Sequence, residues 1–494
     1  MLKLRHYQKD LIDQIREKFA QGKKRVILCS PTGSGKTVVF SSVVIQTISK
    51  DMFNRVLIVT DRVELFRQTW GALDAMGATP TVINAKTKNG EALHGRVVVG
   101  MVETIKRRYK RYGDDFRKHM GQFSLIIIDE AHKGNFRDII DMYPDCYVIG
   151  ATATPVSTSK KNPLKNHYDD IALSVDIPDL VGDGFLASER SYRMDVIDED
   201  QLTKSYSTGD YTEKSQAIEF ARPQVFDGLL SAWQERAEGL KTLVFCVNIE
   251  ETYHTADNFR KAGYDPSVIT SKSSAEDRAE QIRKFHSRPD GIMVNCGILT
   301  TGYDHPPIEC IIMNRATMSL PLWLQCCGRG SRVAPGKEEF VIIDMGGNIK
   351  RLGMWSDSRD WRDWFFNPGR PKEEQPAPVK ECKKCGALIH ASVRKCQYCG
   401  FEYPIEEMPK LKGQLVEVNP VPIELQGKRI SDLSVPELVE LQRVKRYSNG
   451  FVLRILRSRG REALQEFAQI KNYKPGWIHF NADGPKSFTN FRVK

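Results

Sequence analysis

The sequence predicts an α/β protein with two lobes, each built on a parallel β-sheet. Short, nearly continuous apolar runs alternate with helical stretches, and such runs are typical of strands that are covered on both faces. The pattern occurs twice along the chain. A length of 494 residues is also too great for one ordinary hydrophobic core, so more than one domain is expected.

The expected strands fall into two groups. In the first lobe, residues 1–190, they are Arg25–Cys29, Val56–Thr60, Val97–Gly100, Leu125–Ile128 and Tyr147–Ile149. In the second lobe, residues 226–370, they are Thr242–Phe245, Ser267–Ile269, Gly291–Val294, Cys310–Met313 and Phe340–Ile343. Residues 191–225 are expected to be a linker or surface excursion, because Asp195 to Ser215 is polar, acidic and poor in apolar periodicity.

Composition is that of a globular protein, with 40% hydrophobic and 27% charged residues. The chain has no run of eighteen apolar residues, and its first six residues lack the apolar core of a signal peptide. These observations favour a cytoplasmic location and no membrane association. The net charge of +11 and the pI of about 9.0 favour a polyanionic partner, although a basic surface without a specific role is about as common.

Composition changes after Asn348. A group of aromatic residues between Trp355 and Phe366 precedes a proline-containing spacer at Lys372–Pro378. A cysteine cluster follows within residues 379–404, and a basic, helical region is expected over residues 405–494. The helical patterns in that region cover Val435–Arg457 and Arg461–Ile470.

The segment Ser30–Thr37 is predicted to hold a triphosphate. It follows an expected strand and opens a helical stretch, so backbone N–H groups and a helix N-terminus would face the phosphates. Lys36 can reach the β- and γ-phosphates, and the Thr37 hydroxyl can ligate Mg²⁺. The predicted binding residues are Ser30, Pro31, Thr32, Gly33, Ser34, Gly35, Lys36 and Thr37, with Ser30 in place of the usual first glycine of this motif.

An acidic partner for the phosphate loop is Asp129-Glu-Ala-His132. It follows the expected strand Leu125–Ile128, so its carboxylates should lie at the edge of the sheet where ligands bind. Asp129 is placed to hold Mg²⁺, and Glu130 to orient and deprotonate the attacking water. The hydroxyls of Gly150–Pro155, after the next strand, are positioned to bond this acidic loop and to couple hydrolysis to lobe movement.

A late segment, Gln325–Arg332, carries two arginines, Arg329 and Arg332. Cations of this kind complete a triphosphate site from outside. A nucleotide site divided between distant parts of a chain indicates two lobes that close when ATP binds. This arrangement favours a motor over a simple phosphatase or kinase.

These segments, in this order, resemble superfamily 2 helicases of the DEAD/DEAH-box type over about residues 1 to 350. Asp61–Arg62, Thr104, Lys241–Asn248 and Leu299–Asp304 resemble the nucleic-acid and coupling motifs of that family. The resemblance implies two RecA-like lobes, ATP with Mg²⁺, and movement on nucleic acid.

The resemblance also implies roles for single residues. Arg5 and Gln8 would hold and read adenine, and Gly302 and Asp304 would approach the nucleotide from the second lobe. Thr300 and Thr301 would lie in the groove that tracks the strand. Gln325, Gly328, Arg329 and Arg332 match the pattern Q-x-x-G-R-x-x-R. In that match Gln325 belongs to the catalytic set, and the two arginines stabilise charge on the transferred phosphoryl group, which contributes roughly 10³–10⁵ in rate.

A narrower resemblance is to the RadD-like branch of bacterial and phage proteins. It rests on Leu299–Asp304, Gly328–Lys337, Asp344–Asn348 and a four-cysteine element after the motor. The resemblance implies a DNA-dependent ATPase that acts in replication, recombination or repair, with DNA favoured over RNA. The region after the motor is shorter here and diverges.

Four cysteines form two C-x-x-C pairs, each followed by glycine: Cys382, Cys385, Cys396 and Cys399. Four thiolates at this spacing suit tetrahedral Zn²⁺ in a closed structural site. Disulfides are the alternative, and they are uncommon in a cytoplasmic motor. The basic and aromatic residues around the ligands suit nucleic acid or a docked protein, or else the element only stabilises the fold.

The C-terminal region is dense in cations: Arg443, Lys445, Arg446, Arg454, Arg457, Arg459 and Arg461. Such a run is explained as often by a solvated helix face as by a binding surface. The turn Tyr473–Trp477 would either pack on the tail helices or present Trp477 to a partner. A single-strand-binding or recombination protein is the expected kind of partner for the zinc element or the tail.

The predicted function is therefore an ATP-dependent nucleic-acid helicase or translocase. Two alternatives stay open. In the first, the chain is the motor of a restriction-like system, and another subunit carries out cleavage. In the second, it is a binding platform in which ATP only controls the affinity for DNA or a protein. Intact Lys36, Glu130 and the arginine pair argue against a pure binding platform.

Overall fold

The computed structural model describes most of the chain. The described residues are 4–61, 63–75, 77–87, 95–133, 136–157, 162–206, 208–300, 302–368, 379–381, 384, 388–390, 395, 400–402, 415–417, 423–425, 427–445, 447–473 and 476–482. All four predicted zinc ligands, Cys382, Cys385, Cys396 and Cys399, lie outside these residues, as do Thr301 and Arg446. The zinc-ribbon-like element therefore stays a prediction.

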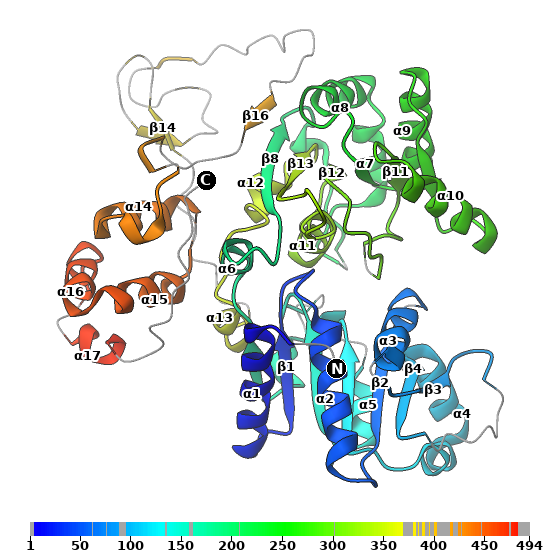
Figure 1. Cartoon of the computed structure of the whole chain (residues 1–494). Coiled ribbons are helices and arrows are strands. Elements are labelled where there is room, and N and C mark those ends of the chain that lie inside the picture. Colours follow the sequence, from blue (N-terminus) through cyan, green and yellow to red (C-terminus); the bar gives the residue numbers. More distant parts are fainter. Residues whose placement is uncertain are drawn as a thin grey trace.

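Two α/β lobes stack one above the other, with a helical region beside them (Figure 1). The first lobe has a parallel sheet in the order β3-β4-β2-β5-β6-β1-β7. Its strands are β1 (Arg25–Cys29), β2 (Val56–Thr60), β3 (Thr81–Ile83), β4 (Val97–Met101), β5 (Leu125–Asp129), β6 (Tyr147–Thr152) and β7 (Asp170–Leu173). Its helices are α1 (His6–Ala20), α2 (Lys36–Lys50), α3 (Val63–Ala75), α4 (Val102–Met120) and α5 (Arg137–Met142).

The second lobe has a sheet in the order β10-β11-β9-β12-β13-β8-β16, parallel except for the edge strand β16. Its strands are β8 (Ser188–Met194), β9 (Thr242–Cys246), β10 (Ser267–Ile269), β11 (Ile292–Asn295), β12 (Cys310–Asn314), β13 (Glu339–Asp344) and β16 (Leu415–Glu417). Its helices are α7 (Glu213–Phe220), α8 (Pro223–Arg236), α9 (Ile249–Lys261), α10 (Ala275–Ser287), α11 (Leu320–Cys327) and α12 (Asn348–Leu352).

The predicted fold class of two parallel-sheet lobes is confirmed, and each strand named from the sequence is present. The reason the runs are continuously apolar is visible in β5, where Ile126 and Ile128 join the core on one face of the sheet while Leu125 and Ile127 join the core on the other. Both faces are covered, so alternation of polar and apolar residues is lost.

Two predicted boundaries are wrong. The expected division at residue 190 falls inside β8, which pairs with β13 from Ser188 to Arg193, so the second lobe begins by residue 188. The predicted linker at 191–225 consequently belongs to the second lobe and includes α7. The C-terminal region is also not only helical, because β16 extends the second sheet by pairing with β8.

A short segment after the second lobe returns to the first. Helix α13 (Trp361–Phe366) places Phe365 in the core of the first lobe, while Trp361 packs against the cores of both lobes. Lys165 Nζ donates to the carbonyl of Phe366 at 3.0 Å. This segment therefore bridges the two sheets, as does α6 (Ile177–Gly182), which lies where the chain passes between them (Figure 1).

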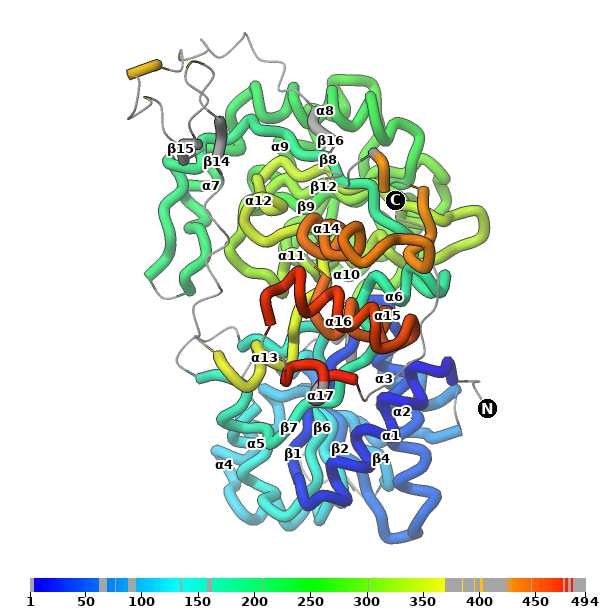
Figure 2. Tube along the Cα trace, turned by 90° about the vertical axis from the view of Figure 1, so that its left-hand side faces the viewer, coloured from blue at the N-terminus to red at the C-terminus, as the bar shows by residue number. Residues whose placement is uncertain are grey.

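The C-terminal helices α14 (Val435–Lys445), α15 (Asn449–Arg459), α16 (Arg461–Ile470) and α17 (Trp477–Asn481) form a bundle with its own hydrophobic core. Figure 1 and Figure 2 show the bundle beside the two lobes. Tyr473 and Trp477 stack within it, with ring centroids 4.7 Å apart, so this turn packs on the tail helices.

At least three of the seven tail cations are held by contacts within the protein. Arg454 forms an ion pair of 2.7 Å with Asp179 in α6, and Arg457 Nε donates to Asn481 O at 2.8 Å. Arg459 donates to the carbonyls of Ile430 and Leu433. The cationic run therefore anchors the bundle and ties it to the junction of the lobes, rather than presenting one continuous basic surface. Among the described residues, no helix is both long enough and apolar enough to cross a membrane.

Candidate active site

The phosphate loop connects β1 to α2 at the edge of the first sheet that faces the second lobe (Figure 1). Gly33 and Gly35 have φ values of +86° and +85°, a left-handed conformation that favours glycine. Lys36 is the first residue of α2, and its Nζ donates to the carbonyls of Ser30 and Pro31 at 3.2 and 3.3 Å. Burial lowers the pKa of Lys36, although Glu130 and Asp129 oppose that shift. The Lys36 ammonium is thus held inside the phosphate loop, where it is predicted to contact the phosphates.

The predicted adenine-reading element is fastened to this loop. Gln8 lies in α1, where its Oε1 accepts from the backbone N of Arg5 at 3.0 Å and its Nε2 donates to Ser34 O at 3.1 Å. Tyr7 donates its hydroxyl to the same carbonyl at 2.7 Å, a contact that the sequence alone does not reveal. The Arg5 guanidinium stacks over the ring of Phe185 at 4.4 Å. Nucleotide contacts at Arg5 and Gln8 would therefore be transmitted directly to the phosphate loop.

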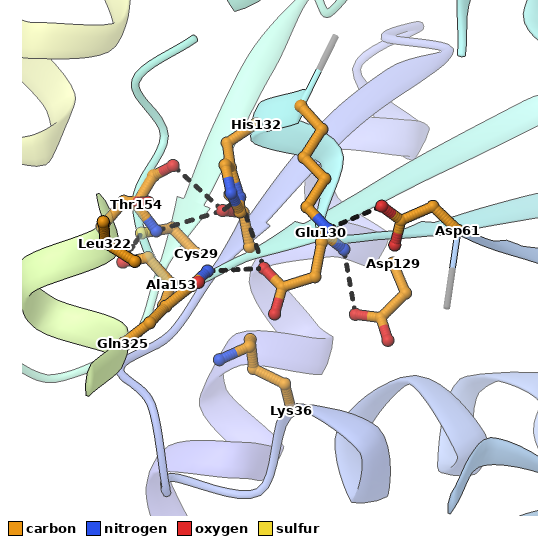
Figure 3. Close-up of polar contacts among 12 residues, drawn as sticks. Cys29, Lys36, Asp61, Asp129, Glu130, His132, Ala153, Thr154, Leu322 and Gln325 are labelled. Atoms are coloured by element: carbon orange, nitrogen blue, oxygen red, sulfur yellow. Dashed lines mark hydrogen bonds and ion pairs between the residues drawn. The ribbon is translucent and has the colours of Figure 1, made fainter. Parts of the chain in front are cut away.

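The acidic loop follows β5 as predicted (Figure 3). Asp129 is buried, and its Oδ1 accepts from the backbone N of Glu130 at 3.0 Å. Burial, together with the neighbouring Glu130, raises the pKa of Asp129 to about 7. Glu130 itself has a φ of +53°, an uncommon conformation for a residue with a side chain, and such strain clusters at functional sites.

The residues present fit a bound magnesium ion. Thr37 and Asp129 offer a hydroxyl and a carboxylate, and Mg²⁺ prefers oxygen ligands of which only one or two need come from the protein. Asp129 makes no ion pair with any described residue. A nearby cation would favour the ionised form of this buried carboxyl group.

Glu130 is linked to the strand that follows it in the sheet. His132 Nδ1 lies 3.3 Å from Glu130 Oε2 and 3.0 Å from Thr152 Oγ1. The Thr152 hydroxyl donates to Thr154 O at 2.9 Å, so the imidazole N–H is the donor toward Thr152. The predicted bond between the acidic loop and the Gly150–Pro155 segment is therefore present. Burial lowers the pKa of His132, which favours the neutral ring.

A further ion pair joins the acidic loop to the end of β2. Lys133 Nζ lies 2.6 Å from Asp61 Oδ2, with both side chains largely buried. Asp61 was singled out in the sequence as part of a coupling motif, but its partner was not. The two residues are 72 positions apart in the sequence, so no local sequence pattern identifies the pair.

The second lobe closes directly onto the phosphate loop. Gln325 in α11 donates from Nε2 to Glu130 Oε2 at 3.3 Å, across the gap between the lobes (Figure 3). A Cβ atom placed on Gly328 would lie 2.7 Å from the Cβ of Thr32. One on Gly33 would lie 3.0 Å from a methyl group of Leu186 and 3.3 Å from the hydroxyl of Ser331. Only glycine at these positions lets the two lobes meet so closely.

The two arginines of this segment hold a loop of their own lobe. Arg329 is buried, and its guanidinium donates to Thr300 O at 2.7 and 3.1 Å and to Tyr303 O. Arg332 pairs with Asp304 and also donates to Tyr303 O at 3.3 Å. Burial, reinforced by the nearby Arg332, lowers the pKa of Arg329 to about 10. The loop that carries Gly302 and Asp304 is thus tied to the segment that touches the phosphate loop.

The predicted strand contact at Thr300 is not on an open surface. Thr300 is buried, and its hydroxyl donates to Gly297 O at 3.0 Å, so it is used within the loop. The other predicted site residues, from Arg5 to Thr37, Asp129 and Glu130, and Gln325 to Arg332, are brought together at one junction between the lobes. Phe185 and Leu186 also belong to this junction, and no pattern in the sequence marks them. Ser331 lies inside the predicted segment, at a position that the pattern Q-x-x-G-R-x-x-R leaves unspecified.

Comparison with known proteins agrees with this geometry. Residues 1–157 match the model of the type III restriction enzyme res subunit, and residues 222–334 match the helicase conserved C-terminal domain. A 51.5 kDa protein of a Lactococcus phage is 28% identical over 384 residues, which cover 76% of this chain and 78% of that protein. The ATP-dependent helicase IRC3 of Saccharomyces cerevisiae is 29% identical over 363 residues, which cover 70% of this chain and 51% of that protein.

Among solved structures, a fragment of an HsdR subunit of a type I restriction enzyme from Vibrio vulnificus YJ016 superimposes with a TM-score of 0.55 at 25% identity. The match covers 71% of this chain and 65% of that one. The chain thus spans most of the phage protein but only about half of IRC3 and less than two thirds of the restriction fragment.

The fold, the site and the two domain matches define the protein as an ATP-dependent helicase of superfamily 2, a nucleic-acid-dependent ATPase. The two domain models match one lobe each. The RadD-like branch and the zinc element go beyond what these comparisons cover.

The raised pKa of Asp129 predicts a pH dependence of stability in the nucleotide-free protein. The unfolded carboxyl group ionises near its ordinary value of 3.8, whereas the folded one ionises near 7. Stability should therefore fall as pH rises from about 4 to about 7 and then level off. Replacing Asp129 with Asn removes this penalty. We expect a gain of at least about 1 kcal/mol at pH 8, or about 1 °C or more in Tm for a chain of this length.

The measurement is thermal unfolding at pH 5 and pH 8 without nucleotide. Asp145→Asn is the matched control, because this aspartate is almost fully exposed and should leave the pH dependence unchanged. A Tm of Asp129→Asn that is equal to or below that of the wild type at pH 8 would contradict the proposed burial of an ionisable group.

Proposed function

We propose that this protein is a DNA translocase or helicase that hydrolyses ATP at the junction of its two lobes. The observation that carries the proposal is the cross-lobe hydrogen bond from Gln325 to Glu130, made where Gly328 meets Thr32. A carboxylate that orients the attacking water and is touched by the opposite lobe links hydrolysis to lobe position. A binding platform would not need that link.

In the proposed cycle, ATP enters between the lobes and its phosphates replace the loop carbonyls as partners of Lys36. Bound Mg²⁺ would neutralise phosphate charge, with Thr37 and Asp129 as its protein ligands. Glu130 then orients water for attack on the γ-phosphate and accepts its proton. Release of phosphate changes the charge beside Glu130 and with it the contact to Gln325.

The arginine pair supplies the link to nucleic acid. Arg329 and Arg332 hold the loop from Thr300 to Asp304, and their neighbours touch the phosphate loop. A γ-phosphate that attracts the guanidinium groups would pull on this loop, and loss of the phosphate would release it. Repeated closing and opening moves the lobes along a backbone through contacts that are largely independent of sequence.

DNA is the favoured substrate, because the chain carries a net charge of +11 and resembles the DNA-dependent RadD-like branch. We also propose that the protein acts in replication, recombination or repair, and that it is cytoplasmic. A protein partner would bind at the cysteine element or at the C-terminal tail. The alternative of a motor for a restriction-like system is supported by the likeness to an HsdR subunit.

The test is ATPase activity in the presence of single-stranded DNA, duplex DNA, forked DNA and RNA. We expect DNA to raise the rate about tenfold or more, and the Glu130→Gln variant to lose about 10³-fold or more of the stimulated rate while still binding DNA. A rate that no polynucleotide raises would sink the motor proposal. Full activity in Glu130→Gln would remove the assigned base.

The predicted zinc site has its own test. We expect about one equivalent of zinc per chain, held by Cys382, Cys385, Cys396 and Cys399, and its loss in a Cys396→Ser variant. Cys296→Ser is the matched control, because Cys296 is a free thiol in the second lobe. Metal analysis that gives equal zinc in the wild type and in Cys396→Ser would refute the assignment.

A further inference from the structure

A hairpin projects from the second lobe between β8 and α7. Ser205 N donates to Asp210 O at 2.7 Å, and Thr212 N donates to Thr203 O at 2.8 Å, while Gly209 N closes the turn onto Ser205 O at 2.9 Å. We refer to residues 203–212 as the 203–212 hairpin. In Figure 2 the chain just before α7 extends at the left edge of the molecule, on the side opposite the N-terminus.

The hairpin is anchored, beside its turn, to the loop that follows β12. The Asp210 carboxylate accepts from Met318 N at 2.6 Å and from the Thr317 hydroxyl at 2.7 Å. The Tyr211 ring lies under the Arg351 guanidinium at 5.2 Å, and Arg351 also pairs with Glu199 at 3.0 Å. The hairpin is therefore fastened to the second lobe by hydrogen bonds and charged contacts.

The tip of this anchored hairpin carries a fully exposed aromatic ring, that of Tyr206. Tyrosine is a large amphipathic side chain that usually buries its ring. Nothing in the packing of the described chain requires an aromatic residue at this position. An exposed ring on a rigid support is instead the arrangement that proteins use to stack a planar group.

The surroundings favour an unpaired nucleotide as that planar group. Lys204 and Lys214 are exposed near the hairpin, and neither forms an ion pair with a described residue. Asp210 is the acidic residue within the 203–212 hairpin, and both of its oxygens already accept hydrogen bonds. Of the acidic residues beside the hairpin, Asp195 pairs with Arg193 and Glu199 with Arg351, whereas Asp200 and Glu213 are exposed. Proteins that bind single strands combine cations along the backbone with aromatic rings on which bases stack.

The position relative to the sheet agrees with this occupant. The Thr317–Ser319 loop follows the carboxyl end of β12, the edge at which ligands bind in parallel α/β sheets. A polyanionic strand along this edge would pass beside the hairpin.

We propose that Tyr206 is a stacking platform for an unpaired base of the strand that the motor follows, with Lys204 and Lys214 contacting its phosphates. The inference rests on the proposed function. It adds that the nucleic acid is single-stranded where it meets Tyr206. It also connects the strand to the ATP site. Asp210 holds Thr317, Thr317 accepts from Ser319 N at 2.9 Å, and Ser319 caps α11, the helix that carries Gln325.

The test is the affinity for a fluorescent oligo-dT strand and for the same sugar-phosphate backbone with abasic sites, measured with a non-hydrolysable ATP analogue. Loss of one stacked base weakens binding about fivefold to a hundredfold. We expect that loss in Tyr206→Ala for the strand with bases, and little change for the abasic strand. Tyr206→Trp should restore the affinity, because any large aromatic ring can stack.

Phe53→Ala is the matched control, since Phe53 is an aromatic residue that is 81% exposed but lies on the first lobe, whereas the hairpin belongs to the second. Equal affinity of the wild type and Tyr206→Ala for the strand with bases would overturn the proposal, as would an equal loss on the abasic strand. If the wild type binds no strand and no polynucleotide stimulates its ATPase, the motor function itself fails, and this inference fails with it.

Discussion

The structure depends on one contact, the meeting of the phosphate loop with the C-terminal end of α11. Thr32 and Gly33 on one side face Gly328 and Ser331 on the other, with no room for a methyl group at Gly328 and little at Gly33. Neither sheet holds a complete site. The first positions Lys36 and the carboxylates, and the second brings the arginine-bearing turn to them. Close packing between two rigid supports makes the site sensitive to small shifts of either lobe.

Other features of the protein act on that contact. The loop at Thr300–Asp304 is attached to it through Arg329 and Arg332, and α11 begins at the Thr317–Ser319 loop, which is attached to the 203–212 hairpin. On the opposite side, α13 packs on the first lobe and the C-terminal bundle pairs with α6 through Arg454. Movement of the lobes must therefore be accommodated by α6, α13 and the bundle, which places the tail in a position to influence the motor.

Much of the fold and the chemistry could be predicted from the sequence, because strands buried on both faces leave long apolar runs and phosphate chemistry needs fixed spacings. Strands with polar residues, such as β8 with Ser188, Glu189 and Arg190, leave no such signal, and so the boundary between the lobes was misplaced. Contacts between distant segments were equally hidden. Asp61 with Lys133, and Arg454 with Asp179, are pairs of charges whose meaning appears only when the sheets are assembled.

The most direct test of a site divided between the lobes is ATP hydrolysis by the Gly328→Ala variant. The added methyl group would meet the Thr32 side chain at 2.7 Å and the Leu324 carbonyl of its own lobe at 2.9 Å, and so hold the lobes apart. The phosphates are expected to be held by Lys36 and by backbone N–H groups of the loop, which the methyl group does not replace. The account predicts a kcat reduced by about tenfold or more, with nucleotide affinity changed by no more than about threefold. Gly71→Ala, which meets nothing within 4 Å, should behave as the wild type. A Gly328→Ala protein with an undiminished kcat would contradict the claim that hydrolysis requires this contact.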